Sequence, residues 1–498
     1  MGDAVKGNEK TKKEKAAPGK GKGGLTNKER MKIARQKMPE QDPNVRKTNF
    51  DEVALGLPDD LALLDAQRCI QCKKQPCVEG CPVRIDIPAF IKAIEEGDLA
   101  KSARILKDAN SLPAICGRVC PQEQQCELVC TTGKKFDPVA IGHLERFVSD
   151  WERANLGLVL PDVDPPTGRK AAIIGSGPAG LTAAGDLAKK GHEVVIYEAL
   201  HKPGGVMRYG IPSFRLPRDI LDAEIDYLRA LGVKIFCNVV VGKAFTVDDM
   251  LKDYDAVFIG TGAGLPWFMR IPGENLKGVY SANEYLTRII LMGAHGFPEN
   301  DTPVVVGKNV AVIGGGNTAM DACRVSLRMG AEHVYCLYRR SRKEMPARVE
   351  EVDHAEEEGV DFNFLTAPVE FIGDDEGWLK RAKCVRMELG EPDSSGRRRP
   401  VVIEGSEFEI DVDTCVEAIG FGANPLVPQT TPGLETDKWG IVVADKETGK
   451  TTRDRVYAGG DIITGGSTVI SAMGQARVAA AAMHEMLMSA EPVSKKKT

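Results

Sequence analysis

The sequence predicts an α/β protein in which a helical, cysteine-rich domain precedes two parallel-sheet domains. Two glycine-rich turns, beginning at Gly175 and Gly314, each follow a short apolar strand and precede a helical stretch. Eight of the 13 cysteines fall between Cys69 and Cys130. A chain of 498 residues is also too long for one hydrophobic core. These observations predict two nucleotide-binding units of the βαβ type behind a metal-binding domain.

The composition excludes several classes of function. The net charge of −5 argues against a nucleic-acid or membrane-surface role for the whole chain. No apolar run reaches the roughly 18 residues of a membrane-spanning helix. The Lys- and Gly-rich N-terminus also lacks the apolar core of a secretory signal. We therefore expect a cytoplasmic protein, and in that reducing compartment clustered cysteines favour metal binding over disulfides.

The helical domain is expected over residues 38–165, after a disordered basic tail and a short helix over 1–37. A helix over 61–72 delivers the first cysteines, and a helical spacer over 87–107 separates two cysteine runs. These runs are Cys69-x2-Cys72-x4-Cys77-x3-Cys81-Pro and Cys116-x3-Cys120-Pro-x5-Cys126-x3-Cys130. In ferredoxin-type runs, three close thiolates hold one cluster and the fourth belongs to another. We therefore predict two [4Fe-4S] clusters; zinc is the competing interpretation.

The first nucleotide-binding unit is AAIIGSGPAG, which opens the first part of an FAD-binding domain expected over 166–285. The strand over 171–174 leads into a G-x-G-x-x-G turn, in which the glycines permit a tight turn, close approach to a pyrophosphate and close helix packing. The turn comprises Gly175, Ser176, Gly177, Pro178, Ala179 and Gly180. Glu198 ends the second strand, where an acid holds ribose hydroxyls. The alternative is a glycine turn in an ordinary βαβ unit.

A second unit of the same kind lies in an NADP(H)-binding domain expected over 286–425. Gly314, Gly316 and Ala319 supply G-x-G-x-x-A. Arg339 and Arg340 follow its second strand where an NAD-binding unit has an acid. Guanidinium groups bind a 2′-phosphate that a carboxylate would repel, so we predict a preference for NADP(H). The alternative for these arginines is a solvated turn, and Arg397–Arg399 are interpreted as solvated loop charge.

The FAD-binding domain is expected to resume over 426–490, before a tail over 491–498. VYAGGD, with Gly460 and Asp461, and the helix start at GGSTVISA suit ribityl hydroxyls and the pyrimidine edge of a flavin. One nucleotide unit resuming after the other is the organisation of two-dinucleotide-binding flavoproteins. The five cysteines beyond Cys130 form no Cys-x2-Cys pair, which argues against a redox disulfide.

Six motifs together carry a family resemblance: the cysteine block, GSGPAG, VMRYGIPSFRLP, GGGNTAMD, YRRSRKEMPAR and YAGGDIITGG. Over roughly residues 38–488 the chain resembles the small (β) subunit of NADPH-dependent glutamate synthase and its relatives. Those relatives include the large subunit of NADH-dependent reduced ferredoxin:NADP oxidoreductase, sulfide dehydrogenase and the N-terminal half of dihydropyrimidine dehydrogenase. MPEQDPNVRKTNF and NPLVPQTTPGL are most similar to the ferredoxin:NADP oxidoreductase branch.

The resemblance implies a ligand set for each cluster. One cluster takes Cys69, Cys72, Cys77 and Cys130, and the other takes Cys81, Cys120 and Cys126. In some relatives a downstream Gln or Glu is the fourth ligand, and IGHLERF places Glu145 there, leaving Cys116 over. The alternatives are a surface carboxylate for Glu145 and a buried thiol for Cys116.

The resemblance also implies cofactor contacts. Val119 lies beside the flavin, and the FAD set includes Glu198, Gly204, Gly205, Val206, Arg215, Gly460, Asp461, Thr468 and Val469. The NADP(H) set is Gly314, Gly315, Gly316, Asn317, Thr318, Arg339, Arg340, Ala418, Ile419 and Gly420.

The predicted function is electron transfer between NADP(H), FAD, two [4Fe-4S] clusters and a partner subunit; no catalytic acid, base or nucleophile is assigned. The first hypothesis is the NADP(H) subunit of a ferredoxin:NADP oxidoreductase, with a flavin and [2Fe-2S] subunit as partner and ferredoxin as a further candidate partner. The alternative is the small subunit of glutamate synthase, with its large subunit as partner. A third hypothesis is a non-enzymatic iron–sulfur scaffold.

Overall fold

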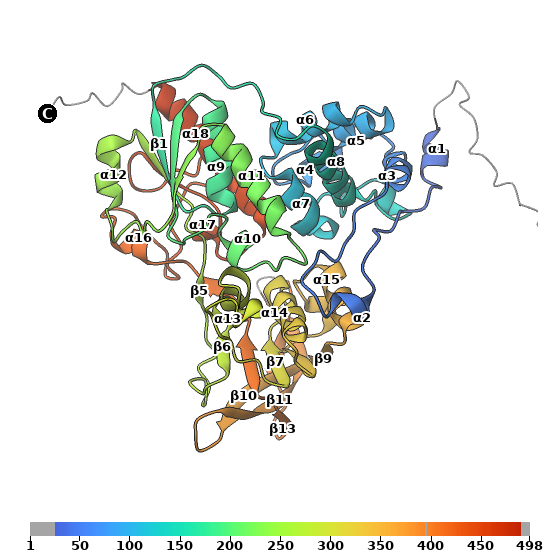
Figure 1. Cartoon of the computed structure of the whole chain (residues 1–498), viewed down its shortest axis with the longest axis vertical. Helices are drawn as coiled ribbons and strands as arrows, with labels where there is room; N and C mark the ends of the chain where they lie inside the picture. The colour runs from blue at the N-terminus through green and yellow to red at the C-terminus, as the bar shows by residue number, and fades with distance from the viewer. Residues whose placement is uncertain (1–24, 394–395, 490–498) are drawn as a thin grey trace, which may run out of the picture.

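The computed structural model describes residues 25–393 and 396–489, so most of the expected N-terminal tail and the expected C-terminal tail lie outside it. Figure 1 shows a helical part beside one sheet domain, with a second sheet domain packed below both. No helix in the described ranges combines the length and apolar character needed to cross a membrane. All 13 cysteines are free thiols.

The helical part places its cysteines in loops more than in helices. Its helices are α1 (Asn27–Arg30), α2 (Pro43–Arg46), α3 (Asp59–Ala66), α4 (Pro76–Glu79), α5 (Ile87–Glu95), α6 (Leu99–Ala109), α7 (Pro113–Val119) and α8 (Ile141–Asn155). The helix expected over 61–72 ends at Ala66, because Gln71 has a left-handed φ of 50° that no α-helix accommodates. The expected spacer divides into α5 and α6 at Gly97, where Asp98 caps the second helix.

The first parallel sheet combines four strands from residues 170–259 with one strand from residues 456–458. Its order is β16-β4-β1-β2-β3, with β1 (Lys170–Ile174), β2 (Glu193–Tyr197), β3 (Lys234–Phe236), β4 (Ala256–Ile259) and β16 (Val456–Ala458). The helices of this domain are α9 (Pro178–Lys189), α10 (Val206–Tyr209), α11 (Arg218–Ala230), α12 (Val247–Asp253), α16 (Leu426–Gln429), α17 (Asp461–Thr464) and α18 (Val469–Ser489). The hydrophobic core under α9 and α18 continues without a break into the helical part, through Ile115, Leu144 and Met473.

The second parallel sheet has the order β6-β14-β7-β8-β9. Its strands are β6 (Val279–Ser281), β7 (Asn309–Ile313), β8 (His333–Tyr338), β9 (Asp361–Phe364) and β14 (Thr414–Glu417), with α13 (Ala282–Leu286), α14 (Asn317–Arg328) and α15 (Val349–Glu358). An antiparallel sheet of β10 (Thr366–Gly373), β11 (Leu379–Pro392), β12 (Arg398–Val402) and β13 (Phe408–Asp411) packs against it through Leu337, Phe371 and Cys384.

Two features join the second sheet domain to the rest of the chain. The chain crosses between the sheet domains twice, and the crossings pair as β5 (Leu265–Pro266) and β15 (Phe421–Gly422). In addition, the linking segment (residues 38–57, which carries α2) runs from the helical part across α15. The Arg328 Nε donates to the Asn49 carbonyl at 2.8 Å, and the Val53 amide donates to the Phe214 carbonyl at 3.0 Å. The linking segment therefore contacts both sheet domains.

Candidate redox cofactor sites

Four cysteines that are distant in sequence meet around one pocket of the helical part. Cys69, Cys72, Cys77 and Cys130 line one pocket together with apolar residues such as Ile91 and Val139. Burial raises the pKa of Cys69 to about 11 and of Cys77 to about 12, and the neighbouring thiols add to both shifts. Converging thiols that resist ionisation without a cation fit a metal cluster, which stabilises thiolates.

The remaining cysteines of the two runs form a second, deeper group. Burial and the charges of Glu127, Cys81 and Glu145 raise the pKa of Cys126 well above its usual range. A hydrogen bond with Cys116, together with burial, raises the pKa of Cys120. Cys81, Cys120 and Cys126 are all buried, so this group also fits a cluster shielded from water.

Glu145 and Cys116 both lie at the second group. Glu145 is 5% exposed, so the alternative of a surface carboxylate is wrong. Its Oε1 accepts a hydrogen bond from Asn110 Nδ2 at 2.7 Å, and burial raises its pKa to about 8. The Cys116 thiol is fully buried and donates to Asn110 Oδ1 at 3.7 Å. A carboxylate without solvent and with one polar partner is costly, which fits a ligand that a cation would compensate.

The second cysteine group packs directly against the first sheet domain. A methyl group added at Gly474, in α18, would lie 2.7 Å from the carbonyl oxygen of Pro82. The Cys116 thiol lies 3.6 Å from Met473 Sδ. Val119, which we expected beside a flavin, is buried at the end of α7. The deeper cysteine group and α18, which begins at Val469, therefore share one packed interface.

The first glycine-rich turn has the open face that a pyrophosphate needs. Gly175 has a φ of +96°, and a methyl group at Gly180 would lie 1.9 Å from the Gly175 carbonyl oxygen, so both positions require glycine. At Gly177, in contrast, no described atom lies within 4 Å of an added methyl group. Gly205 packs against Gly177, with a methyl group at Gly205 only 2.7 Å from the Gly177 Cα. The turn is tight below and open above, which fits a bound phosphate.

Polar groups surround this open face. The Glu198 carboxylate accepts hydrogen bonds from the amides of Ser176 at 2.9 Å and Leu200 at 2.8 Å, which fix its position at the end of β2. Burial raises the pKa of Asp461 to about 6. The Gly460 amide donates to Gln475 Oε1 at 2.8 Å, and Thr468 accepts from the Ser471 amide at 3.2 Å at the start of α18.

Two residues of this site were missed from the sequence. The Thr261 hydroxyl is buried and has no hydrogen-bond partner among the described residues, which fits a polar ligand. Burial, together with the charges of Asp461 and Glu198, raises the pKa of Tyr209 to about 12. Thr261 follows β4 by two residues and Tyr209 ends α10, and the fold brings both to this site.

The structure places Arg215 away from the expected arrangement. Its Nη1 lies 2.8 Å from both oxygens of Asp321, and its Nε lies 2.9 Å from Glu351. Asp321 belongs to α14 and Glu351 to α15, so this arginine is bound to the second sheet domain. Its flavin contact stays a prediction.

The second glycine-rich turn lies beside the end of β14. Gly314 has a φ of +144°, and a methyl group there would lie 2.3 Å from the Ala418 carbonyl oxygen. A methyl group at Gly315 would lie 2.6 Å from the Tyr338 ring. Asn317 opens α14 and accepts from the Arg348 amide at 2.9 Å; Thr318, Ile419 and Gly420 flank the same turn. Close packing below and a helix N-terminus above fit a second dinucleotide.

The three arginines after β8 have different surroundings. Arg340 is 6% exposed; its Nε donates to the Arg398 carbonyl at 2.8 Å and its Nη2 to Asp393 at 2.7 Å. Arg342 pairs with Asp353 and Glu356. Arg339 is exposed and has no hydrogen bond or ion pair with any described residue. Of the three, Arg339 is the one whose guanidinium is left for an anion.

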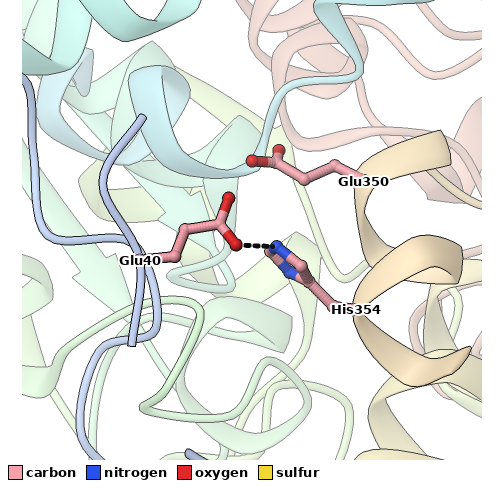
Figure 2. Close-up of side chains that lie close together, drawn as sticks. All are labelled: Glu40, Glu350 and His354. Atoms are coloured by element: carbon pink, nitrogen blue, oxygen red, sulfur yellow. Dashed lines mark hydrogen bonds and ion pairs between the residues drawn. The ribbon is translucent and has the colours of Figure 1, made fainter. Parts of the chain in front are cut away.

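A third polar group links the helical part to α15. Figure 2 shows Glu40 of the linking segment facing Glu350 and His354, and the Glu40–His354 contact is 2.9 Å. The potential ligand atoms of the three residues lie within 4.8 Å of one another. Arg46 already pairs with Glu40, and Arg348 already pairs with Glu350. The neutralised carboxylates make this an interdomain contact and not a cation site.

Comparisons with known proteins match both parts of this architecture. Residues 46–156 match the family model described as dihydropyrimidine dehydrogenase domain II, 4Fe-4S cluster, and residues 169–481 match pyridine nucleotide-disulphide oxidoreductase. The glutamate synthase [NADPH] small chain of Escherichia coli is 36% identical over 89% of this chain and 95% of its own length. The chain belongs to the family of the glutamate synthase small chain. It is thus a member of the iron–sulfur flavoprotein oxidoreductases that use NADPH.

Other relatives of the family are longer than this chain. The putative oxidoreductase AegA of E. coli is 38% identical over 87% of this chain and 67% of its own length. The NADP(+)-dependent formate dehydrogenase subunit beta of Moorella thermoacetica is 41% identical over 83% of this chain and 60% of its own length. FprA of Mycobacterium tuberculosis in complex with NADPH is similar in structure, with a TM-score of 0.54, 22% identity and coverage of 64% of this chain and 85% of FprA. That similarity concerns the fold of the sheet domains.

Proposed function

We propose that the chain is an electron-input subunit that transfers electrons between NADP(H) and a partner subunit through FAD and two [4Fe-4S] clusters. FAD, when bound, supplies the conversion between a two-electron carrier and one-electron carriers. The protein's own residues bind, orient and shield these groups. Gly177, Glu198 and Asp461 belong to the FAD site, and Arg339 belongs to the NADP(H) site.

The observation that carries this proposal is the contact between the deeper cysteine group and α18. Pro82 follows Cys81 and packs on Gly474 of α18. Gly474 lies five residues after Val469, which we assign to the flavin site. The four-cysteine pocket is lined by residues of the helical part alone. The charge of Cys77, one of its four thiols, is among those that raise the pKa of Cys126, so the two cysteine groups are neighbours. We call the cluster assigned to the four-cysteine pocket the outer cluster. An arrangement in which the deeper cluster lies between the flavin and the outer cluster supports electron transfer toward a partner at the helical part.

Of the two candidate partners, a glutamate synthase large subunit has the fuller support. The small chains of E. coli and Azospirillum brasilense are 36% and 37% identical to this chain, and the matches cover 95% and 94% of their length. A ferredoxin:NADP oxidoreductase subunit is the second candidate, favoured by the similarity of MPEQDPNVRKTNF and NPLVPQTTPGL to that branch. Under either hypothesis, chemistry on glutamine belongs to the partner, because all the sites we assign among the described residues serve electron transfer.

The test is anaerobic purification of the full chain followed by two assays. The first measures iron, FAD and NADPH-dependent reduction of a one-electron dye. Bound FAD, iron for two clusters and dye reduction that prefers NADPH support the proposal. Iron without flavin would favour the scaffold hypothesis and overturn it.

The second assay mixes the holoprotein with each candidate partner. Glutamate formation from glutamine, 2-oxoglutarate and NADPH with a glutamate synthase large subunit supports the first reading. NADPH-linked ferredoxin reduction with a flavin and [2Fe-2S] subunit supports the second. Neither activity with either partner would overturn both readings while leaving the dye result intact.

A further inference from the structure

We propose that Arg397, which directly precedes β12 in the β11–β12 hairpin, completes the NADP(H) site and is a specificity-determining residue for the 2′-phosphate. This inference rests on the proposed NADP(H) site at the end of β8. It differs from the sequence interpretation, in which Arg397–Arg399 are solvated loop charge.

The hairpin tip is held against the end of β8 by specific contacts. Arg340 is the second residue after β8, and its guanidinium binds the Arg398 carbonyl and the Asp393 carboxylate of the hairpin. The Asp393 amide in turn donates to the Arg397 carbonyl at 2.8 Å, which closes the tip. The base of the hairpin is fixed too, because Leu379 and Cys384 of β11 are buried against the parallel sheet. Arg340 therefore serves to fix the hairpin at the site.

Because Arg340 holds the hairpin at the end of β8, Arg397 lies close enough to Arg339 for its charge to act on the Arg339 guanidinium. Partial loss of solvent lowers the pKa of the Arg339 guanidinium, and the positive charges of Arg340 and Arg397 lower it further. Arg398 turns the other way, since its Nε donates to the Gly390 carbonyl of its own hairpin at 3.1 Å. A group of guanidinium ions with one nearby carboxylate, Asp393, attracts a dianion.

The location matches the chemistry of a 2′-phosphate. In a βαβ dinucleotide unit, the residue after the second strand faces the adenosine ribose, and here that residue is Arg339. The Tyr338 ring beside Gly315 ties this strand end to the glycine-rich turn. A phosphate on the ribose would be approached by Arg339 from β8 and by Arg397 from the hairpin, so that the two arginines bind it from different elements.

The experiment compares Arg397→Gln with Arg399→Gln in the holoprotein. Both substitutions remove one positive charge from the same hairpin, but Arg399 lies two residues further from the tip. Dye reduction gives kcat/KM for NADPH and for NADH. We expect Arg397→Gln to lower kcat/KM for NADPH about tenfold, to weaken competitive inhibition by 2′,5′-ADP, and to leave NADH within about twofold. Arg399→Gln should leave both unchanged, and Arg397→Lys should recover most of the NADPH value.

Two further results separate this inference from the proposed NADP(H) site. Arg339→Gln tests the site itself and is expected to lower NADPH use by a similar factor. If Arg339→Gln has that effect while Arg397→Gln behaves as Arg399→Gln does, the hairpin proposal is overturned and the site stands. If neither variant changes the NADPH/NADH ratio, both are overturned. Flavin spectra and iron content equal to those of the parent confirm that each variant is folded.

Discussion

Arg46 Nε lies 3.0 Å from Glu358 Oε1, and this ion pair joins the linking segment to the second sheet domain beneath the surface. Both side chains are almost fully buried, and Glu358 also binds Arg324 at 2.7 Å and Arg328 at 2.6 Å. One carboxylate therefore pairs with three guanidinium groups from two parts of the chain.

The Glu358 network gives the first prediction. Glu358→Gln would remove the carboxylate that pairs with buried Arg328 and one of the carboxylates that pair with Arg46 and Arg324, so the free energy of unfolding should fall by about 3–5 kcal/mol. The matched control is Glu357→Gln, because Glu357 also pairs with Arg46 but its side chain is 52% exposed. That change should cost less than about 1 kcal/mol. Chemical denaturation of the two variants measures the difference; equal losses would contradict the network.

The outer cluster gives the second prediction. Cys130→Ser removes one of the four thiols that line the pocket of Cys69, Cys72, Cys77 and Cys130, so the purified protein should lose about half of its iron and keep its FAD. Cys237→Ser, in the first sheet domain, should change neither. Iron analysis with flavin absorbance provides the measurement. Full iron content in the Cys130 variant would remove that residue from the ligand set.

Glu145 and Cys116 provide a third, paired prediction. If the carboxylate completes the deeper cluster, Glu145→Ala should alter that cluster's EPR signal and lower the iron content. Cys116→Ala should preserve both, because the thiol already has Asn110 as a partner. The reverse pattern would assign the fourth ligand to the thiol. A Glu145→Ala protein with full iron and both cluster signals would exclude the carboxylate.

The first glycine-rich turn allows binding and folding to be separated. Gly177→Ala adds a methyl group into space free of described protein atoms, so it should weaken FAD binding while leaving the melting temperature of the flavin-free protein unchanged. Gly180→Ala places a methyl group 1.9 Å from a carbonyl oxygen and should lower both. Flavin titration and thermal melts of flavin-free protein distinguish the two. Tight FAD binding by Gly177→Ala would contradict the phosphate assignment.

Stability should depend on pH through Glu224 of α11. Burial raises the pKa of this carboxyl to about 7 from 4.5, while the Ala114 amide, which donates to it at 3.0 Å, lowers it. A raised pKa means that the native state binds the proton more tightly than the unfolded chain. Stability from this group is therefore complete below 4.5 and falls as the pH rises through about 7.

Glu224→Gln keeps an acceptor for the Ala114 amide and removes the charge. Thermal melts near pH 8 should show a variant more stable than the parent, and near pH 5 the difference should shrink. Asp226→Asn, an exposed change on the same helix, should show no pH-dependent difference. A Glu224→Gln variant with no gain near pH 8 would contradict the raised pKa.

Local patterns predicted the parts of the fold that depend on neighbouring residues. The strands before Gly175 and Gly314 and the helices after them were expected from the sequence, because each turn and its flanking elements are contiguous. The helix expected up to Cys72 was too long, since the helix ends at Ala66 and Gln71 has a left-handed backbone conformation beside the cysteines. The spacing of the glycines indicates where the backbone packs closely. The periodicity of apolar residues, in contrast, does not predict the conformation of a loop.

Long-range pairings were beyond prediction from a single sequence. Arg215 pairs with Asp321, 106 residues away, and Arg340 binds a hairpin more than 50 residues downstream. Nothing in YRRSRKEMPAR distinguishes an arginine that anchors a hairpin from one that faces solvent. The domain boundaries and the cofactor contacts stay predictions, because they depend on groups that the sequence implies but does not position.

The order of strands in the first sheet has a consequence for synthesis of the chain. β16 joins the sheet beside β4, although about 200 residues separate them, and α18 packs on α9 from still further along. On the ribosome, strands β1 to β4 therefore emerge with an unpaired edge and an uncovered apolar face. The second sheet domain, contiguous from β6 to β14, can fold while this edge is still waiting. Until α18 leaves the exit tunnel, the nascent first sheet domain therefore exposes the kind of strand edge and apolar surface that chaperones bind.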